Sequence, residues 1–296
     1  MIAITGATGQ TGSKIANLLL NNGQKIRVIG RSENKLKPFK ERGAEIAVGN
    51  QDDIQFLTNA FRNSNAVYLL IPPKMDVRDI REYYNLIGDT SIEAIIKSGV
   101  KKVVFLSSMG AELNSGTGPV LGLYDIESKL GRLTDVDLAI LRPAFFMENF
   151  LANIPLIKHE HINSTTMPKD VPFVMISTID IAKKVAEHLT SQSFTGHNII
   201  ELFGDRLSYR EITRLIGEAI GIPDLPYVQA SDAVAFKNMT GMGVSENMAN
   251  SLIEMTGAIG KGLIHPTMID PLKPNTNTNF QTFVNEVFKP AYQNAD

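Results

Sequence analysis

Three glycines near the N-terminus have the spacing of a phosphate-binding turn. Gly6, Gly9 and Gly12 follow a short apolar run and precede 13–20, which has the apolar pattern of a helix. A strand, a glycine turn and a helix form the first unit of a dinucleotide-binding fold. Gly6 allows a sharp turn, Gly9 lets backbone approach a pyrophosphate, and Gly12 lets the helix pack close to the strand. The sequence therefore predicts a dinucleotide site.

The start of the predicted helix should contribute directly to that site. Its first N–H groups have no partner within the helix and lie at the positive end of the helix dipole, which favours phosphate. A glycine triplet alone also joins strands to helices in proteins that bind no nucleotide, so the flanking strand and helix are needed for this interpretation. The residues expected to contact the cofactor here are Gly6, Ala7, Thr8, Gly9, Gln10, Thr11 and Gly12.

The residues after the second predicted strand, 25–29, indicate which nicotinamide cofactor binds. NAD sites usually carry Asp or Glu about 20 residues past the glycines. This chain has Gly30, Arg31 and Ser32 there, with Lys35 one turn onward. Arg31 can pair with a 2′-phosphate and Ser32 can donate a further hydrogen bond, although Arg31 and Lys35 also fit solvated charges around a loop. The absence of the acidic residue favours NADP(H) over NAD(H).

Composition excludes several classes of function. The chain has 296 residues, a formal net charge of −2 and a pI near 6.2, which disfavours binding to nucleic acid or an anionic membrane. It has no cysteine, which excludes disulfides, thiolate catalysis and Cys-ligated zinc. No apolar stretch approaches the roughly 20 residues of a membrane span. Since the chain starts with a strand, we expect no targeting peptide and a cytoplasmic protein.

Strand-like and helix-like segments alternate through the first half. This order predicts an α/β fold, a doubly wound parallel sheet with helices on both faces. The predicted strands are 25–29, 44–48, 66–71, 103–106 and 137–141 after the first, and the predicted helices are 53–61 and 78–98.

The alternation of strand-like and helix-like segments becomes less regular beyond residue 150. We expect a dinucleotide-binding domain over 1–150 and a smaller, mainly helical lobe over 151–296, with segments that return to the first domain. Helices are predicted at 179–189, 208–220, 231–260 and from 280 to the end, a strand at 198–203, and a long loop at 260–279. The lobe should cover the carboxyl edge of the sheet, where open α/β sheets bind ligands.

Together these motifs resemble the NmrA-like family, atypical members of the short-chain dehydrogenase/reductase superfamily. The resemblance runs nearly end to end, and the Arg-Pro…Phe…Glu-Asn run within 141–149 is its most specific mark. The matching segments are 5–12, Arg31, 69–73, 105–108, 128–129, 141–149 and 283–292.

The resemblance implies a Rossmann domain that binds NADP(H), with the 2′-phosphate near Arg31. It also implies that 50–52 forms the adenine-side turn, although Asn50 and Gln51 stand where Gly-Asp-like pairs are frequent. Lys129 matches a lysine that points toward the nicotinamide ribose. The other residues expected along the nicotinamide half are Pro72, Pro73, Ser107, Ser108, Pro143, Phe145 and Phe146. The two serines could equally cap the turn that follows their strand.

Typical short-chain dehydrogenases use a Tyr and a Lys four residues apart, on one helical face, for proton transfer. The nearest pair here is Tyr124 and Lys129, five apart, and in a regular helix Lys129 would be turned about 140° away. We therefore expect no such relay if both residues share a helix. Tyr124 remains a candidate catalytic residue only from a helix start or loop, and a partly buried aromatic is the simpler interpretation.

Two further groups of residues bear on metal binding and on the interior of the lobe. His159 and His161 flank Glu160, but nothing completes a metal shell, so a polar loop is expected and no metal site is predicted. The methionines of the lobe would suit either its core or an adaptable apolar pocket. They are Met239, Met242, Met248 and Met255.

Two functions from different classes fit these residues. The first is an NADPH-dependent oxidoreductase that transfers hydride to a quinone or a similar small conjugated acceptor, a reaction that needs little acid–base help. Reduction of an activated double bond or imine differs only in substrate. The second is a non-catalytic NADP(H)-binding redox sensor that acts through a protein partner. We favour the reductase, because a lobe rich in Met and Phe over the sheet edge suits a substrate pocket.

Overall fold

A seven-stranded parallel sheet forms the centre of the larger part of the molecule. The computed structural model describes residues 1–190 and 194–295. The strand order is β10-β6-β5-β4-β1-β2-β3, so the chain winds outward in both directions from β1, as predicted. The strands are β1 (Ile2–Ile4), β2 (Ile26–Gly30), β3 (Glu45–Val48), β4 (Ala66–Leu69), β5 (Lys102–Leu106), β6 (Asp137–Pro143) and β10 (His197–Leu202).

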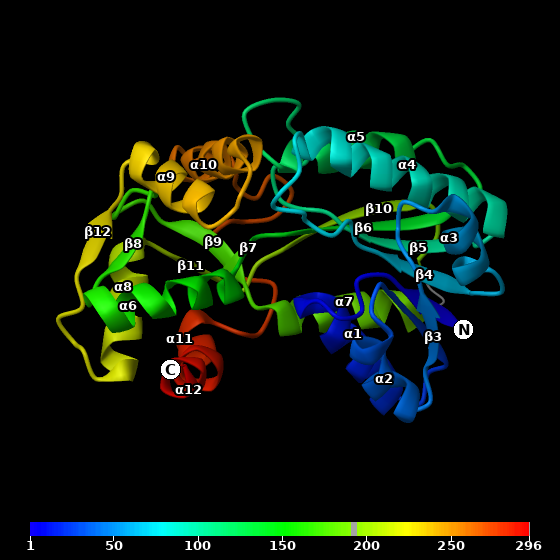
Figure 1. Cartoon of the computed structure of the whole chain (residues 1–296), viewed down its shortest axis with the longest axis horizontal. Coiled ribbons are helices and arrows are strands. Elements are labelled where there is room, and N and C mark those ends of the chain that lie inside the picture. The colour runs from blue at the N-terminus through cyan, green and yellow to red at the C-terminus, as the bar shows by residue number, and fades with distance from the viewer. Residues whose placement is uncertain (191–193, 296) are drawn as a thin grey trace.

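Helices cover both faces of this sheet (Figure 1). One face carries α1 (Gln10–Asn21), α2 (Glu33–Glu41) and α7 (Thr178–Thr190), and the other carries α3 (Ile54–Phe61), α4 (Ile80–Ser98) and α5 (Val120–Leu130). Side chains alternate along each strand, so Ile2 and Ile4 contribute to the core on the α1 side and Ala3 to the core on the α4 side. Burial on both faces explains the nearly continuous apolar strands.

Capping residues define the ends of α3 and α4. The Asp53 carboxylate accepts the Phe56 amide at 2.9 Å and so caps α3. Asp79 caps α4 by accepting the amides of the first turn, and α4 ends at Gly99, whose φ of 74° is left-handed. The predicted start of α4 was therefore two residues early, because residue 78 precedes the cap.

A smaller lobe adjoins the carboxyl edge of the sheet (Figure 1). It contains a three-stranded and a two-stranded sheet and several helices. Its strands are β7 (Phe145–Phe146), β9 (Phe173–Ile176) and β11 (Asp205–Leu207), then β8 (Asn163–Thr165) and β12 (Tyr227–Gln229). Its helical segments are a 3₁₀ turn at Met147–Asn153, α6 (Ile154–Glu160), α8 (Tyr209–Ile220), α9 (Asp232–Gly241), α10 (Glu246–Gly260), α11 (Phe280–Phe283), a π turn at Val284–Phe288, and α12 (Lys289–Asn294).

The chain passes between the two parts more than once. After β9 it returns to the large sheet, where α7 packs on α1 and β10 pairs with β6 in parallel. We call 1–143 and 178–202 the body, and 145–176 and 205–295 the lobe. In the described part of the chain, no helix is both long and apolar enough to cross a membrane.

Two lobe segments differ from the sequence interpretation, and a third agrees with it except at its first residue. The predicted helix over 231–260 is two helices, α9 and α10, separated by a turn that contains Gly243 at φ 87°. His159 and Glu160 end helix α6, and His161 follows at φ 55°, so the predicted polar loop was wrong. The long loop predicted at 260–279 begins one residue later, because Gly260 is the last residue of α10, and 261–279 contains no helix or strand.

Candidate functional site

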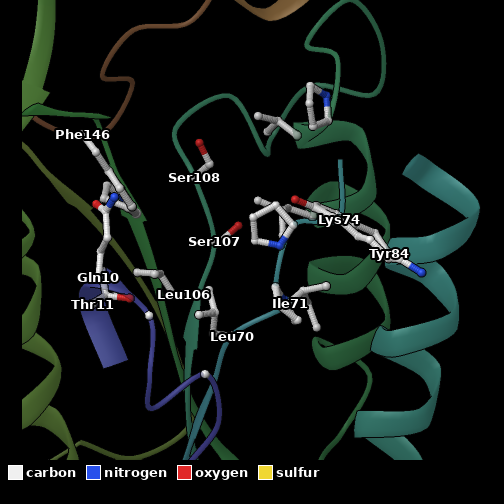
Figure 2. Close-up of a pocket in the computed structure, with 18 of the residues that line it drawn as sticks. Gln10, Thr11, Leu70, Ile71, Lys74, Tyr84, Leu106, Ser107, Ser108 and Phe146 are labelled. Atoms are coloured by element: carbon white, nitrogen blue, oxygen red, sulfur yellow. The ribbon is translucent and has the colours of Figure 1, made fainter. Parts of the chain in front are cut away.

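A cavity of about 730 Å³ lies between the carboxyl edge of the sheet and the lobe. Its lining comes from the ends of β1, β2, β4, β5 and β6 in the body, and from β7, β9 and α10 in the lobe. Figure 2 shows Gln10 and Phe146 on one side, Lys74 and Tyr84 on the other, and Ser107 between them. Such a site at the strand ends is where an open α/β sheet binds ligands.

The glycine turn between β1 and α1 is fixed by close backbone packing. Gly6 has φ +61°, and a Cβ on it would lie 2.6 Å from Leu70 Cδ2. A Cβ on Gly12 would lie only 2.2 Å from the Gly6 carbonyl oxygen. Gly9 is the N-cap of α1, and no side chain caps this helix. The N–H groups of its first turn are therefore free of side-chain partners and available to an anion.

Hydrogen bonds behind this turn join β1 and α1 to β4. The Leu70 amide donates to Thr5 Oγ1 at 2.8 Å, and Thr11 Oγ1 lies 3.1 Å from the Tyr68 hydroxyl. Burial raises the pKa of Tyr68, which therefore keeps its proton at neutral pH. These bonds hold the turn in register with the end of β4.

Arg31 marks one end of the cavity. It is exposed at the end of β2 and, within the described residues, has no hydrogen bond or ion pair. The predicted adenine-side turn, 50–52, also lines this end, and Gln51 Nε2 donates to the Leu70 carbonyl oxygen at 3.1 Å. Ser32 occupies the N-cap position of α2 without a capping hydrogen bond from its side chain, Lys35 lies within the helix, and neither borders the cavity.

Ser107 and Ser108 line the middle of the cavity, just after β5. Ser107 Oγ donates a 2.5 Å hydrogen bond to Glu127 Oε1, and Arg142 binds both oxygens of that carboxylate. The sequence analysis missed Glu127. Its spacing of seven residues from Val120, which is two turns back on the inward face of α5, was the available signal, together with a buried arginine that needs a counter-ion.

Tyr124 and Lys129 both lie in α5, and neither borders the cavity. The ammonium of Lys129 donates to Asn85 Oδ1 at 2.7 Å and Asp89 Oδ1 at 2.6 Å, which are both on α4. Tyr124 and Lys129 are thus five residues apart in one regular helix, so their side chains cannot share one face. This position does not favour the expected contact of Lys129 with the cofactor.

The lobe closes the far end of the cavity with an apolar surface. Met248, Leu252, Met255 and Ile259 recur at helical spacing on α10 and all line the cavity. We call this end, with the side chains that β7 and β9 add to it, the acceptor chamber. Its residues are Phe145, Phe146, Phe173, Val174, Met248, Leu252, Met255, Ile259 and Ile264. Met239 and Met242 lie at α9 and do not border it.

Three hydrogen bonds hold α10 against loops of the body. The Ser245 amide donates to the Met75 carbonyl oxygen at 2.8 Å, and the Ile80 amide donates to Asn247 Oδ1 at 2.9 Å. Further along, Glu254 Oε2 accepts the Gly118 amide at 3.0 Å. The wall that α10 forms is therefore anchored to the body at its start and near its middle.

The structure brings most of the predicted cofactor residues to one cavity. Those that line it are Gly6, Thr8, Gly9, Gln10, Thr11, Arg31, Pro72, Ser107, Pro143 and Phe145. Those that do not are Ala7, Gly12, Ser32, Lys35 and Lys129. The segment 141–149 contributes in two ways, because Asn149 lines the cavity while the buried Glu148 accepts the Thr178 amide at 3.0 Å and so fixes the start of α7.

Comparison with known proteins agrees with this architecture. The model of the NmrA-like family matches residues 1–286. The chain belongs to the NmrA-like family. Among its relatives, the NAD(P)H azoreductase of Xenophilus azovorans is 25% identical over 256 residues, 86% of each chain. Quinone oxidoreductase 2 of Escherichia coli is 25% identical over 272 residues, 88% of this chain and 89% of the relative.

A solved structure shows the same fold over nearly the whole length. The NADPH-dependent quinone oxidoreductase of Escherichia coli, complexed with NADPH, superposes with a TM-score of 0.81 at 22% identity. The match covers 97% of this NmrA-like chain and all of the other. The lobe is therefore part of the shared fold, along with the nucleotide-binding sheet.

Proposed function

We propose that this NmrA-like protein is an NADPH-dependent reductase that transfers hydride to a quinone or a similar small, uncharged, conjugated acceptor. The observation that carries the proposal is the distribution of charge along the cavity. Of its three charged residues, Arg31 and Asp52 follow β2 and β3, and Lys74 lies in the loop after β4 that contacts the start of α10. The lining from β5, β6 and the lobe carries no charge, so one end suits a polyanionic cofactor and the other an apolar acceptor.

The residues present fit NADP(H). The uncapped first turn of α1 can receive the diphosphate, because its N–H groups have no side-chain partner and the dipole favours an anion. Arg31 can form a forked pair with the 2′-phosphate, since no carboxylate of the described chain occupies its guanidinium. The cofactor assignment thus uses groups that the fold itself leaves unsatisfied.

The side chains of the acceptor chamber would position the acceptor and exclude water from its face. When bound, the nicotinamide supplies a hydride, which carries two electrons to the acceptor. The reduced oxygen of a quinone then takes its proton from water, so no residue has to donate one. Phe145 and the α10 stripe supply flat and adaptable surfaces for a planar ring. Tyr124 and Lys129, which lie outside the cavity lining, take no part in this reaction.

The relatives support the same class of acceptor. The azoreductase and the quinone oxidoreductase are named for conjugated, electron-accepting substrates. Both match this chain over more than four fifths of its length, lobe included. An acceptor of this class requires a flat apolar pocket next to the nicotinamide, which is what the acceptor chamber offers.

Stopped-flow oxidation of bound NADPH tests the proposal. The acceptors are a neutral naphthoquinone and its sulfonated counterpart, which share a ring system and differ in charge. We expect loss of NADPH absorbance that depends on the acceptor, with kcat/KM at least about tenfold higher for the neutral quinone, because the chamber offers the sulfonate no partner. Tight NADPH binding without oxidation by either quinone would contradict the reductase and favour the redox sensor.

A further inference from the structure

A row of buried polar groups begins at the cavity and has no part in the proposed hydride transfer. It runs from Ser107 to Glu127 and on to Arg142, which are 5%, 8% and 6% exposed. Arg142 Nε and Nη2 donate to the two oxygens of Glu127 at 3.1 and 2.6 Å. Arg142 Nη1 also donates to Glu112 Oε2 at 3.1 Å. The three elements β5, α5 and β6 are therefore joined beneath the cavity.

The charges in this row fix the direction of the hydrogen bond from Ser107. Arginine stays protonated in proteins, and an ionised carboxylate accepts hydrogen bonds but cannot donate them. Arg142 donates to both oxygens of Glu127, so both oxygens of this carboxyl group act as acceptors. In the 2.5 Å contact the proton must therefore come from Ser107 Oγ.

Because Ser107 Oγ donates its proton to Glu127, the hydrogen bonds that it can form in the cavity are restricted. A serine hydroxyl has one proton to donate and two lone pairs that can accept. With the proton directed at Glu127, only the lone pairs are available to a ligand. Ser107 therefore accepts hydrogen bonds in the cavity and does not donate them, and a ligand group beside it must carry an N–H or O–H.

The order of the strands indicates which part of the ligand reaches Ser107. Arg31 follows β2, the glycine turn follows β1, and Ser107 follows β5 on the far side of β4. A cofactor with its 2′-phosphate at Arg31 and its diphosphate over α1 extends its nicotinamide toward β5. The N–H donor on a nicotinamide ring is its carboxamide.

We propose that Ser107 is a hydrogen-bond acceptor reserved for the nicotinamide carboxamide, and that Glu127 and Arg142 are positioning residues that keep it in this state. The inference rests on the proposed function, because it takes NADP(H) as the ligand of the cavity. It adds a residue that recognises the reactive end of the cofactor, and it explains why an ion pair is buried beneath that end.

Calorimetric titration with two ligands tests this role without turnover. The ligands are NADP⁺ and its 3-acetylpyridine analogue, in which a methyl group replaces the carboxamide NH₂. The measured quantity is the ratio of the analogue's Kd to the Kd of NADP⁺. In Ser107→Ala the ratio should fall about five- to tenfold, the size of one neutral hydrogen bond, because NADP⁺ alone loses a contact.

Two further variants separate positioning from simple stability. Glu127→Gln should also lower the ratio. The new amide can donate to Ser107 Oγ, so the Ser107 proton can turn into the cavity and the hydroxyl is no longer limited to accepting. Glu112→Gln is the matched control, since Glu112 contacts Arg142 but not Ser107, and it should leave the ratio unchanged. If Glu127→Gln does not fold, Ser107→Ala still decides, because it keeps the pair of Glu127 and Arg142.

The outcomes distinguish this inference from the proposed function. If both ligands bind and the ratio is the same in wild type and Ser107→Ala, the role of Ser107 is overturned and the cofactor assignment stands. If neither ligand binds the wild-type protein, both proposals fail. A purely structural role for the row would change both Kd values together and leave their ratio unchanged, which also overturns the inference.

Discussion

Both carboxylate oxygens of Glu201 accept the backbone amide of Thr267, at 3.0 and 2.9 Å. Glu201 lies at the end of β10 and is only 2% exposed. The Met268 amide donates to the same carboxylate at 2.9 Å. The segment 261–279, which lacks helix and strand, is thus fixed to the edge of the body by a buried acidic side chain.

Replacement of Glu201 by Gln should destabilise the protein by about 1–3 kcal/mol, because the Gln side chain has only one acceptor atom for N–H groups that two oxygens now accept at this part-buried contact. Urea unfolding measures the loss, and limited proteolysis should show faster cleavage within 261–279. Glu187→Gln is the control, since Glu187 is exposed and, among the described residues, its carboxylate pairs only with Lys184; it should change stability by less than about 0.5 kcal/mol. Equal effects of the two substitutions would contradict the anchoring role.

Alanine at Gly12 and at Gly9 should have different consequences. The Cβ of Gly12→Ala would meet the Gly6 carbonyl oxygen at 2.2 Å, whereas that of Gly9→Ala would lie 3.3 Å from the same atom. We expect Gly12→Ala to lower the free energy of unfolding by about 1–3 kcal/mol. Gly9→Ala should unfold much as wild type does but bind NADPH more weakly, as thermal unfolding and fluorescence titration would show. Equal stability of the two variants would contradict this account of the turn.

Arg31→Asp should shift preference from NADPH toward NADH. A charge-assisted contact with the 2′-phosphate would be lost and replaced by repulsion, so the Kd for NADPH should rise about 10- to 100-fold while that for NADH changes little. Lys35→Asp makes the same change of charge four residues away, outside the cavity lining, and is the matched control. Unchanged NADPH affinity in Arg31→Asp would show that the cofactor assignment is wrong.

A lysine at position 255 tests the acceptor chamber. Met255→Lys places an ammonium in an uncharged wall, so kcat/KM for a neutral quinone should fall at least about tenfold. The Kd for NADPH should change less than about twofold if the chamber holds only the acceptor. Met242 follows α9 and is 76% exposed, so Met242→Lys should leave both values unchanged. A similar loss in both variants would point to an effect of overall charge.

The stability of the contact between α4 and α5 should depend on pH below about 4. The hydrogen-bonded Arg81 guanidinium is the main cause that lowers the pKa of Asp125 from its usual value, and Asn85 adds to the effect. Because the folded pKa lies below the unfolded one, the stabilisation is present above the unfolded pKa near 3.9 and is lost as pH falls through the folded pKa.

Asp125→Asn should therefore cost at most about 1 kcal/mol at pH 7, since the pair is partly exposed. Its stability should fall less than that of wild type between pH 4 and pH 2, because the group that titrates has been removed. Urea unfolding at pH 7, 4 and 3 measures the difference. Parallel loss of stability in the two proteins would contradict the assigned cause.

Local chemistry explains why so much of the fold was predictable. The apolar run predicted at 66–71 and the helices predicted at 53–61 and 78–98 depend on residues close together in the chain, so their meaning does not depend on the rest of it. The gap between α9 and α10 was missed because residues 242–245 interrupt a polar and weakly patterned stretch. The end of α6 at Glu160 was missed because its seven residues are too few to show a helical period.

The parts of the site that depend on short local motifs could be predicted from the sequence. The glycine turn and Arg31 are read from short motifs with a direct physical meaning. The pairing of Ser107 with Glu127 depends on how α5 lies over β5, a contact between residues 20 apart that no local pattern records. The position of Lys129 likewise depends on carboxylate and amide groups of α4, 40 or more residues earlier in the chain.

Because α7 and β10 belong to the body although they follow β9 of the lobe in sequence, the two parts cannot be exchanged as simple modules. A cut near residue 150 would remove the strand beside β6 and the helix against α1, and would expose an edge and a face that are covered in the intact chain. Grafting this lobe onto another nucleotide-binding body therefore requires several junctions at once. New acceptor specificity in such a protein is more accessible through substitutions on α10 than through recombination of whole segments.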